Sequence, residues 1–249
     1  MKIIPLSEGS FTIDKTKIFV PFDTRTEMLN SRPIGSLLVE IQPFIIITAN
    51  DVILIDTGLG YNLSNGQPQI YHNLEKVGIN PSQVTKVLMS HLHKDHAGGI
   101  TTKNAITGEQ FIAFPYATYY VQSREFEFAM GIGSASYLKE DIALLSEFSK
   151  VEWLEDDMGY IDDYIQYELT GAHSKFHQVF WIREDNETLF FGGDDAPQLQ
   201  QMKSRFVAKY DFDGKKCMEL RRKWWEKGNN EQWKFLFYHD ITSPIFQHI

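Results

Sequence analysis

The residues whose types and spacing could do chemistry are concentrated between positions 91 and 96. Three histidines and an aspartate lie there in the pattern His-x-His-x-Asp-His. Imidazole nitrogens together with a carboxylate oxygen are ligands that suit a divalent transition metal such as zinc. A polar cluster of this kind is costly to keep beside apolar sequence unless something binds it. The pattern therefore predicts a metal site.

The spacing within this pattern predicts two neighbouring metal positions. His91 and His93 follow residues 84–89, an apolar run that is typical of a β-strand. Alternate residues of an extended segment point to the same side, so both rings can reach one metal. Asp95 and His96 are adjacent and suit a second metal beside the first.

Three further candidate ligands stand at the ends of predicted strands. His173 follows residues 165–169, Asp194 follows Gly192-Gly193, and His239 follows the apolar run 235–238. Ligands at the same ends of several strands can converge on one edge of a sheet. Of the three other histidines, His72 and His248 are predicted to be surface residues, and His177 is considered below.

The sequence resembles the metallo-β-lactamase superfamily of hydrolases. The matching motifs are Asp56-Thr57-Gly58, His91-x-His93-x-Asp95-His96, Gly171-Ala172-His173, Gly193-Asp194 and His239. They occur in the order that the family has and extend over most of the chain. The family fold is α/β, a four-layer αβ/βα sandwich in which two mixed sheets pack together with helices outside. The resemblance therefore implies this architecture here.

The resemblance also implies roles for individual residues. One metal would be held by His91, His93 and His173. The second would be held by Asp95, His96 and His239, and Asp194 would bridge the two. Asp56 would orient a ligand imidazole, as ligating rings usually require. His177 matches the second histidine of the family's Gly-His-Thr-Pro-Gly-His segment, which is not a metal ligand, and is expected to support the site or the fold.

The implied cofactor is a pair of divalent ions, zinc in the first instance, with iron, manganese or cobalt as alternatives. Two such ions roughly 3.5–4 Å apart can hold a bridging water and lower its pKa towards neutrality. The resulting hydroxide would attack the substrate, and Asp95 or Asp194 would be placed to pass a proton to the leaving group. The expected activity is thus hydrolysis of a small molecule.

The substrate class follows from the branch of the superfamily that the chain resembles most. Residues 71–79, 84–99 and 117–122 are most similar to the lactonase-like branch, which includes N-acyl homoserine lactonases. A lactone or an ester is therefore the expected substrate. Those lactonases often carry a tyrosine three residues after the bridging aspartate, where this chain has Pro197, and a tyrosine from elsewhere would have to replace it.

Other activities on the same ligands stay open. Phosphotriester and thioester hydrolysis would use the same ligand set. A mono-iron persulfide dioxygenase is a further alternative, and it would contain one iron in place of two metals. A purely structural metal site is disfavoured, because structural zinc is usually closed and four-coordinate.

The composition of the chain excludes several other classes of protein and of binding partner. The chain has 249 residues, of which 43% are hydrophobic, enough for the core of one domain that covers residues 1–249. A net charge of −9 argues against nucleic acid as a partner, because phosphate binding needs a basic surface. The single cysteine, Cys217, excludes a disulfide framework and a cysteine-rich zinc site. No apolar run of membrane-spanning length occurs, so no membrane partner and a cytoplasmic location are expected. The sequence is compatible with a homodimer.

Hydrophobic periodicity predicts the secondary structure. Strands are expected at 36–41, 44–49 and 52–55 as an antiparallel meander, then at 84–89, 117–122, 151–154, 165–169, 179–183, 188–191 and 233–238. Helices are expected at 70–77, 123–130, 137–148 and 214–227. Five large apolar residues could line an apolar pocket, but core packing is the predicted role for each: Phe22, Met28, Phe128, Met130 and Tyr137.

Overall fold

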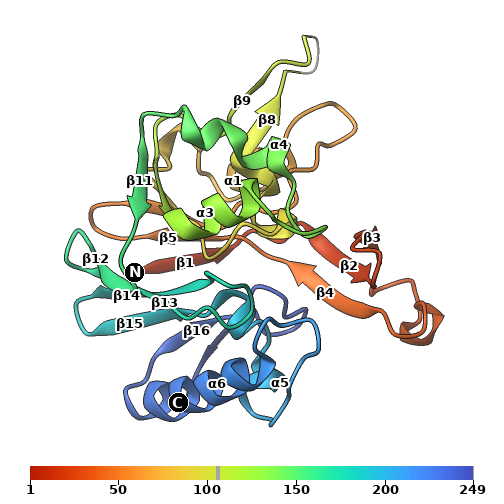
Figure 1. The fold of residues 1–249 in the computed structure, drawn as a ribbon, viewed down its shortest axis with the longest axis vertical. Coiled ribbons are helices and arrows are strands. Elements are labelled where there is room, and N and C mark those ends of the chain that lie inside the picture. Colours follow the sequence, from red (N-terminus) through yellow and green to blue (C-terminus); the bar gives the residue numbers. More distant parts are fainter. Residues whose placement is uncertain (105–106, 249) are drawn as a thin grey trace.

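Two six-stranded sheets packed face to face form the centre of the molecule. The computed structural model describes residues 1–104 and 107–248. The strand order is β1-β5-β6-β7-β10-β11 in the first sheet and β12-β13-β14-β15-β16-β17 in the second. Helices α1, α3 and α4 lie outside the first sheet, and α5 and α6 lie outside the second (Figure 1). This arrangement confirms the predicted four-layer αβ/βα sandwich.

The first sheet changes from antiparallel to parallel pairing along its width. Its strands are β1 (Lys2–Pro5), β5 (Phe44–Ile47), β6 (Val52–Ile55), β7 (Lys86–Leu88), β10 (Thr118–Gln122) and β11 (Val151–Leu154). β1, β5 and β6 pair antiparallel, whereas β6, β7, β10 and β11 pair parallel. The covering helices are α1 (Gln69–Lys76), α3 (Ser123–Met130) and α4 (Lys139–Ile142), and the single turn α2 (Lys94–Ala97) follows β7. Because parallel strands end at one edge, residues that follow them meet there.

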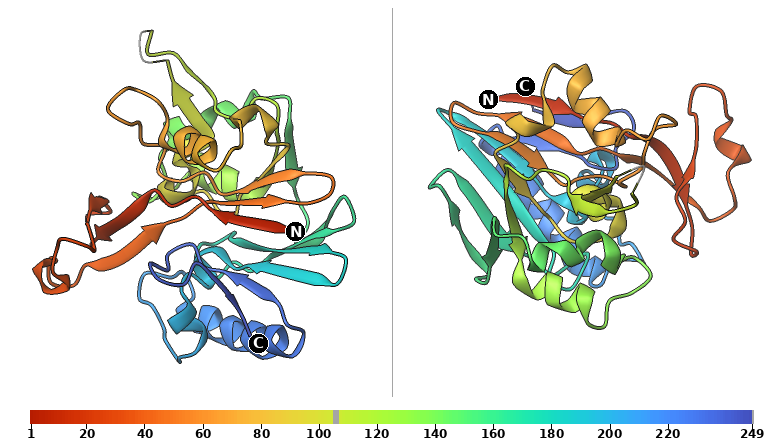
Figure 2. Two further views of the ribbon diagram at one scale, coloured as in Figure 1. Left: turned by 180° about the vertical axis from the view of Figure 1, so that it is seen from behind. Right: turned by 90° about the horizontal axis from the view of Figure 1, so that it is seen from above.

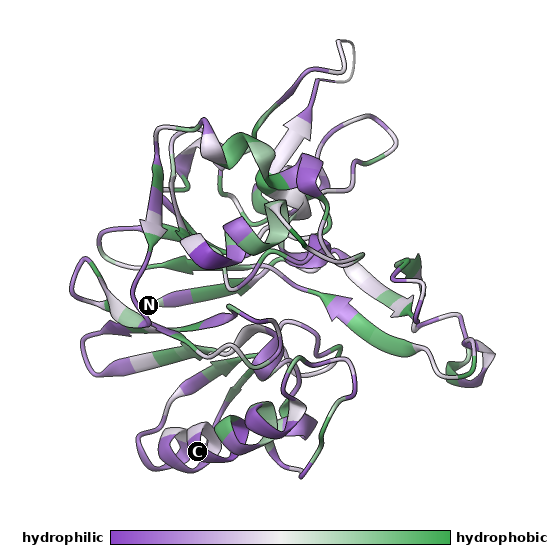
Figure 3. Ribbon diagram, viewed as in Figure 1, coloured by the Kyte–Doolittle hydropathy of each residue, from purple (hydrophilic) through white to green (hydrophobic). Residues whose placement is uncertain are grey.

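The second sheet is antiparallel except for one pair. Its strands are β12 (Met158–Ile161), β13 (Ile165–Leu169), β14 (Gln178–Glu184), β15 (Glu187–Phe191), β16 (Lys234–Leu236) and β17 (Ile245–Gln247), and only β15 and β16 run parallel. α5 (Leu199–Met202) and α6 (Gly214–Asn230) cover its outer face. In Figure 3 much of the α6 ribbon is hydrophilic, whereas the strands carry long hydrophobic stretches. None of the helices formed by residues 1–104 and 107–248 is long and apolar enough to cross a membrane.

The core between the sheets is built from the alternating inward residues of both. Phe44 of the first sheet meets Phe191 of the second edge to face, with ring centroids 6.1 Å apart. A separate aromatic cluster under α6 includes Trp224 and Phe190, whose centroids are 4.9 Å apart. The two sheets and their helices are thus fixed to one another by large side chains that bury most of their surface.

A third, small sheet forms an arm that projects from the sandwich (Figure 2). It consists of β2 (Gly9–Ile13), β3 (Val20–Pro21) and β4 (Leu37–Ile41), in the order β3-β2-β4. The predicted meander of three strands is therefore wrong in its first member, because β4 pairs with β2 and not with β5. Gln42-Pro43 leads the chain from one sheet into the next without reversing it. Only the pairing of β5 with β6 has the predicted form.

The remaining elements are short. They are the hairpin β8 (Thr101–Lys103) and β9 (Gln110–Ile112), and the 3-10 turns η1 (Leu29–Ser31), η2 (Pro81–Gln83), η3 (Gly98–Ile100), η4 (Ala143–Ser146) and η5 (Gly193–Asp195). The helix predicted at 137–148 is divided into α4 and η4. The helix predicted to end at residue 227 continues to Asn230, through Gly228. β12 and β17, which were not predicted, are short and partly exposed.

Candidate metal centre

Four loops from both sheets meet at one edge of the sandwich. The predicted histidine cluster follows β7 of the first sheet. His173, Asp194 and His239 follow β13, β15 and β16 of the second sheet. The structure thus brings together all seven residues for which the sequence suggested metal ligation.

Three imidazole nitrogens form a first group, His91, His93 and His173. His93 Nδ1 lies 3.0 Å from His91 Nε2 and 3.2 Å from His173 Nε2. All three candidate ligand atoms lie within 4.8 Å of one another. Lone pairs of neutral imidazoles that converge in this way suit a transition metal.

The second group consists of Asp95, His96 and His239. Asp95 Oδ2 lies 3.7 Å from His96 Nε2 and 3.5 Å from His239 Nε2. Two nitrogens and one carboxylate oxygen again fit the preferences of a divalent ion. The two groups are adjacent, since His91 and His96 rings have centroids 4.2 Å apart.

Asp194 lies between the two groups. Its Oδ2 is 3.2 Å from His173 Nε2, and its Oδ1 is 3.0 Å from His239 Nε2 and 3.1 Å from His96 Nε2. Each carboxylate oxygen therefore faces a different group, which is the arrangement that a bridging ligand needs. Its neighbour Asp195 points away from both groups, towards His177.

Unpartnered buried atoms support a metal-binding role for this site. His96 Nε2 and Asp194 Oδ1 are buried and lie 3.1 Å apart, but neither makes a hydrogen bond of acceptable geometry with any of the described residues. Leaving such a group unsatisfied costs roughly 1–3 kcal/mol. Both atoms face the centre of the ligand cluster, where a cation would interact with each of them. The residues present therefore fit the metal that their chemistry suggests.

The other ring nitrogen of His96 is held by Asp56. His96 Nδ1 lies 2.8 Å from Asp56 Oδ2, and the backbone N–H and hydroxyl of Ser90 donate to the same carboxylate at 2.8 and 2.7 Å. Asp56 is fully buried and has a φ of +54°. A left-handed backbone is strained for this residue type, and such strain is common at functional sites. Asp56 contacts the imidazole in the manner that the resemblance implied.

Two further supports were not predicted from the sequence. His173 Nδ1 lies 2.8 Å from Asp211 Oδ1, and His239 Nδ1 donates to the carbonyl oxygen of Glu40 at 2.7 Å. Asp211 belongs to an irregular segment without a motif, and Glu40 acts through its backbone. Neither residue therefore carries a signal in the sequence that could have identified it.

His177 supports the loop that carries Asp194. The backbone N–H of Asp194 donates to His177 Nε2 at 3.1 Å, and His177 Nδ1 lies 3.1 Å from Asp195 Oδ2. Asp195 also accepts the backbone N–H of His173 at 2.7 Å. His177 is fully buried and belongs to neither ligand group. It connects the two loops that carry His173 and Asp194.

The electrostatic surroundings fix the charge of two histidines and of the aspartate between the ligand groups. Burial, together with the charges of neighbouring histidines, lowers the pKa of His91 and His93 well below the ordinary value. These rings are therefore neutral and their lone pairs are free for a cation. Although burial opposes it, the charges of His239, His96 and His173 hold the pKa of Asp194 well below its usual range. Asp194 is thus an anion at neutral pH.

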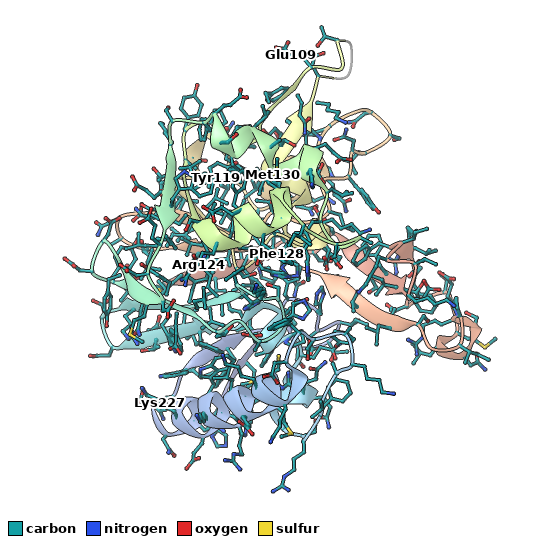
Figure 4. All side chains as sticks on the ribbon, in the orientation of Figure 1. Glu109, Tyr119, Arg124, Phe128, Met130 and Lys227 are labelled. Atoms are coloured by element: carbon teal, nitrogen blue, oxygen red, sulfur yellow. The ribbon has the colours of Figure 1, made fainter. Side chains whose placement is uncertain are left out.

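A cavity of about 790 Å³ opens above this edge and reaches the candidate ligands His93, Asp95, His173, Asp194 and His239. Its apolar wall is formed by Ile13, Phe19, Leu37 and Val39 of the arm, and by Phe128, Tyr137, Tyr210 and Phe212. Figure 4 labels Phe128 on α3, on the side towards the second sheet.

The predicted core packing holds for only some residues. Phe128 and Tyr137 line the cavity, so they do not serve the core alone. Met28 is 71% exposed in the arm, and its predicted core position is wrong. Phe22 is buried, and Met130 packs at the margin of the core below the helices of the first sheet.

Comparisons with known proteins extend the resemblance. Residues 40–207 match the Metallo-beta-lactamase superfamily. N-acyl homoserine lactonase AttM of Azorhizobium caulinodans is 32% identical over 120 residues, 44% of this chain and 40% of that protein. The match thus spans less than half of that relative. N-acyl homoserine lactonase AiiA of Bacillus thuringiensis subsp. kurstaki is 25% identical over 219 residues, 80% of this chain and 81% of that protein.

Solved structures agree with the fold. A probable metal-dependent hydrolase from Staphylococcus aureus has a TM-score of 0.80 at 22% identity, covering 99% of this chain and 91% of that one. AidC, a dizinc quorum-quenching lactonase, has a TM-score of 0.72 at 18% identity, covering 98% of this chain and 88% of that one. At these identities the likeness concerns the fold. The family match over residues 40–207, with the fold and the relatives named above, confirms the predicted family: the chain belongs to the metallo-beta-lactamase superfamily.

Proposed function

We propose that this protein is a hydrolase that uses two divalent metal ions to open a lactone or cleave an ester. The observation that carries the proposal is the position of Asp194, whose two carboxylate oxygens face two adjacent ligand groups. N-acyl homoserine lactonases among the relatives support a lactone as the substrate class. An N-acyl homoserine lactone is the first compound to test.

Each ion would be held by one of the two groups. His91, His93 and His173 would hold the first ion, and Asp95, His96 and His239 the second, with Asp194 shared. Zinc is the preferred metal, because imidazole and carboxylate ligands suit it. When bound, such ions polarise a substrate oxygen and lower the pKa of a water molecule towards neutrality.

The protein's own carboxylates would handle the proton. Asp95 and Asp194 both line the cavity, so both can reach a bound substrate. An ionised carboxylate at that place can accept a proton from the attacking water and return it to the leaving oxygen. Asp194 is ionised, since the charges of three histidines hold its pKa low although burial opposes this.

Tyr210 would take the place of the tyrosine that is missing at Pro197. It lines the cavity, and its ring centroid is 6.2 Å from that of His173. Burial, together with the charges of Asp211 and Asp194, raises the pKa of Tyr210 to about 12. The phenol is therefore protonated and can donate a hydrogen bond to the substrate's carbonyl oxygen. Tyr210→Phe would lower kcat with little change in metal content if this is its role.

The test is a hydrolysis screen with zinc-loaded protein over lactones, esters, thioesters and phosphotriesters, combined with metal analysis. Two metals per chain and turnover of a lactone or ester are expected, and His93→Ala and Asp194→Asn should each abolish turnover. One iron per chain would favour the dioxygenase. Two zinc ions without turnover in any class would favour a structural site. A fully metallated, active Asp194→Asn would refute the bridging role.

A further inference from the structure

Four lysines line the cavity although the chain as a whole is acidic. They are Lys15, Lys17, Lys94 and Lys175. The cavity is also lined by four aspartates, Asp14, Asp95, Asp194 and Asp211, so the lysines are available to an anion only where they are not paired with these carboxylates. The lysines come from three separate segments, namely the β2–β3 turn, the α2 turn and the loop after β13. The fold therefore brings these charges together around one space.

These lysines have no acidic partner in the part of the chain that the structure describes. The lysine and arginine ion pairs recorded there involve Arg25, Lys86, Arg124, Lys227 and Lys234, none of which lines the cavity. An ammonium group without a carboxylate beside it remains available for an anion from solution.

The acidic residues that line the cavity are engaged elsewhere. Asp14 accepts hydrogen bonds from the backbone N–H and the hydroxyl of Thr16, within its own turn. Asp211 is bonded to His173, and Asp95 and Asp194 belong to the candidate metal centre. Lys15 therefore acts on Asp14, its neighbour in the chain, whereas Lys17, Lys94 and Lys175 form no ion pair with any of these carboxylates among the described residues.

Lys17 and Lys94 are the two half-buried lysines among the four, whereas Lys15 and Lys175 are exposed. Lys94 stands between His93 and Asp95, is half-buried, and its backbone N–H donates to the carbonyl of Ser136 at 2.8 Å. Lys17 is half-buried in a tight turn with a φ of +59°, and it lines the cavity that also reaches His93. Both residues line the cavity that reaches the candidate metal ligands.

Lys175 marks the rim of the same space. Its ammonium lies 5.2 Å from the ring centroid of Phe176 and 5.8 Å from that of Phe128. A cation over aromatic faces is held in place without losing its charge. Ile13, Phe19, Leu37 and Val39 of the arm add an apolar surface to the same cavity. The cavity thus presents an apolar wall and a cationic border to whatever binds beside the metal centre.

We propose that the substrate carries an anionic group, a carboxylate or a phosphate, in addition to the ester or lactone that reacts, and that Lys17 and Lys94 bind it. This inference rests on the proposed function. A neutral acyl lactone would use the apolar wall but would leave the lysines without a partner. An amphipathic anionic ester would use both surfaces.

The first test compares two esters that differ only in a distal group, a carboxylate in one and its uncharged carboxamide in the other. A third ester with a distal phosphate separates the two anion types. For the metal-loaded wild type we expect kcat/KM to favour an anionic ester by roughly tenfold, the effect of a charge pair at moderate dielectric. Lys17→Met and Lys94→Gln should each reduce this ratio towards one, with metal content measured in parallel. Lys223→Met, an exposed lysine on α6, is the matched control and should keep the ratio.

A binding measurement separates this inference from the hydrolase proposal. Calorimetric titration of metal-loaded protein with hexane-1-sulfonate and with the neutral hexyl methyl sulfone does not depend on turnover. Tighter binding of the sulfonate, lost in Lys17→Met and kept in Lys223→Met, would support the anion site even if no ester were cleaved. If charged and neutral esters are hydrolysed at equal rates and the two probes bind equally well, the proposed anion site is refuted. The proposal that the protein is a hydrolase would still stand.

Discussion

Replacing Asp211 is expected to weaken metal binding without removing a ligand. The carboxylate of Asp211 is 2% exposed and lies 2.8 Å from His173 Nδ1, so it holds the ring with Nε2 directed at the first ligand group. Without it the ring can rotate or change tautomer. Loss of such a partner typically lowers metal affinity by about 10- to 100-fold, or roughly 1.4–2.8 kcal/mol.

The assay is competition for zinc between the protein and a chelator of known affinity. Asp211→Ala should show the full loss of zinc affinity. Asp211→Asn keeps an acceptor oxygen, so its zinc affinity should fall by less. His173→Ala gives the reference for removing the ligand itself. Glu226→Ala, an exposed acid on α6, controls for the change in net charge. If Asp211→Ala binds zinc as tightly as the wild type, the orienting role is refuted.

Two further predictions concern stability. Burial raises the pKa of Glu8 to about 8, from an ordinary value of 4.5. The folded protein therefore holds this proton more tightly than the unfolded chain, and the contribution to stability is complete below pH 4.5 and is lost as pH rises through 8. Urea unfolding across that range should show the decline, and Glu8→Gln should flatten it; an equal slope in both proteins would contradict the assignment. Gly60→Ala should lower the free energy of unfolding by more than about 1 kcal/mol, because its Cβ would meet the Gly98 carbonyl oxygen at 2.1 Å. Gly78→Ala has a similar positive φ but open space, so thermal unfolding should show a smaller loss; equal losses would mean that the contact with Gly98 is unimportant.

The sequence predicted the parts of the site that depend on residue type and position after a strand. His173, Asp194 and His239 could be identified because each follows an apolar run and occurs in the family's order. The fold class followed from the same resemblance. The ligand role of these residues stays a proposal, although the structure brings their side chains together.

Other features depend on distance in space and leave no local pattern. Asp211 reaches His173 from 38 residues away through an irregular segment. β4 was assigned to the wrong sheet because apolar alternation predicts a strand but not its partner. Lys94 borders the cavity without any sign of this in the sequence, since what surrounds a turn is decided by remote loops.

The origin of the ligands on two sheets links metal binding to the packing of the sandwich. His91, His93, Asp95 and His96 follow a strand of the first sheet, and His173, Asp194 and His239 follow strands of the second. A metal held by both sets would bind only while the layers are together, and each tenfold rise in free metal above the dissociation constant would add about 1.4 kcal/mol to folding. The apparent melting temperature would then rise with the concentration of free metal. A substitution that leaves a cavity at Phe44, in the core between the sheets, would weaken metal binding from a distance. The ions would act as a reversible cross-link between the two halves of the molecule.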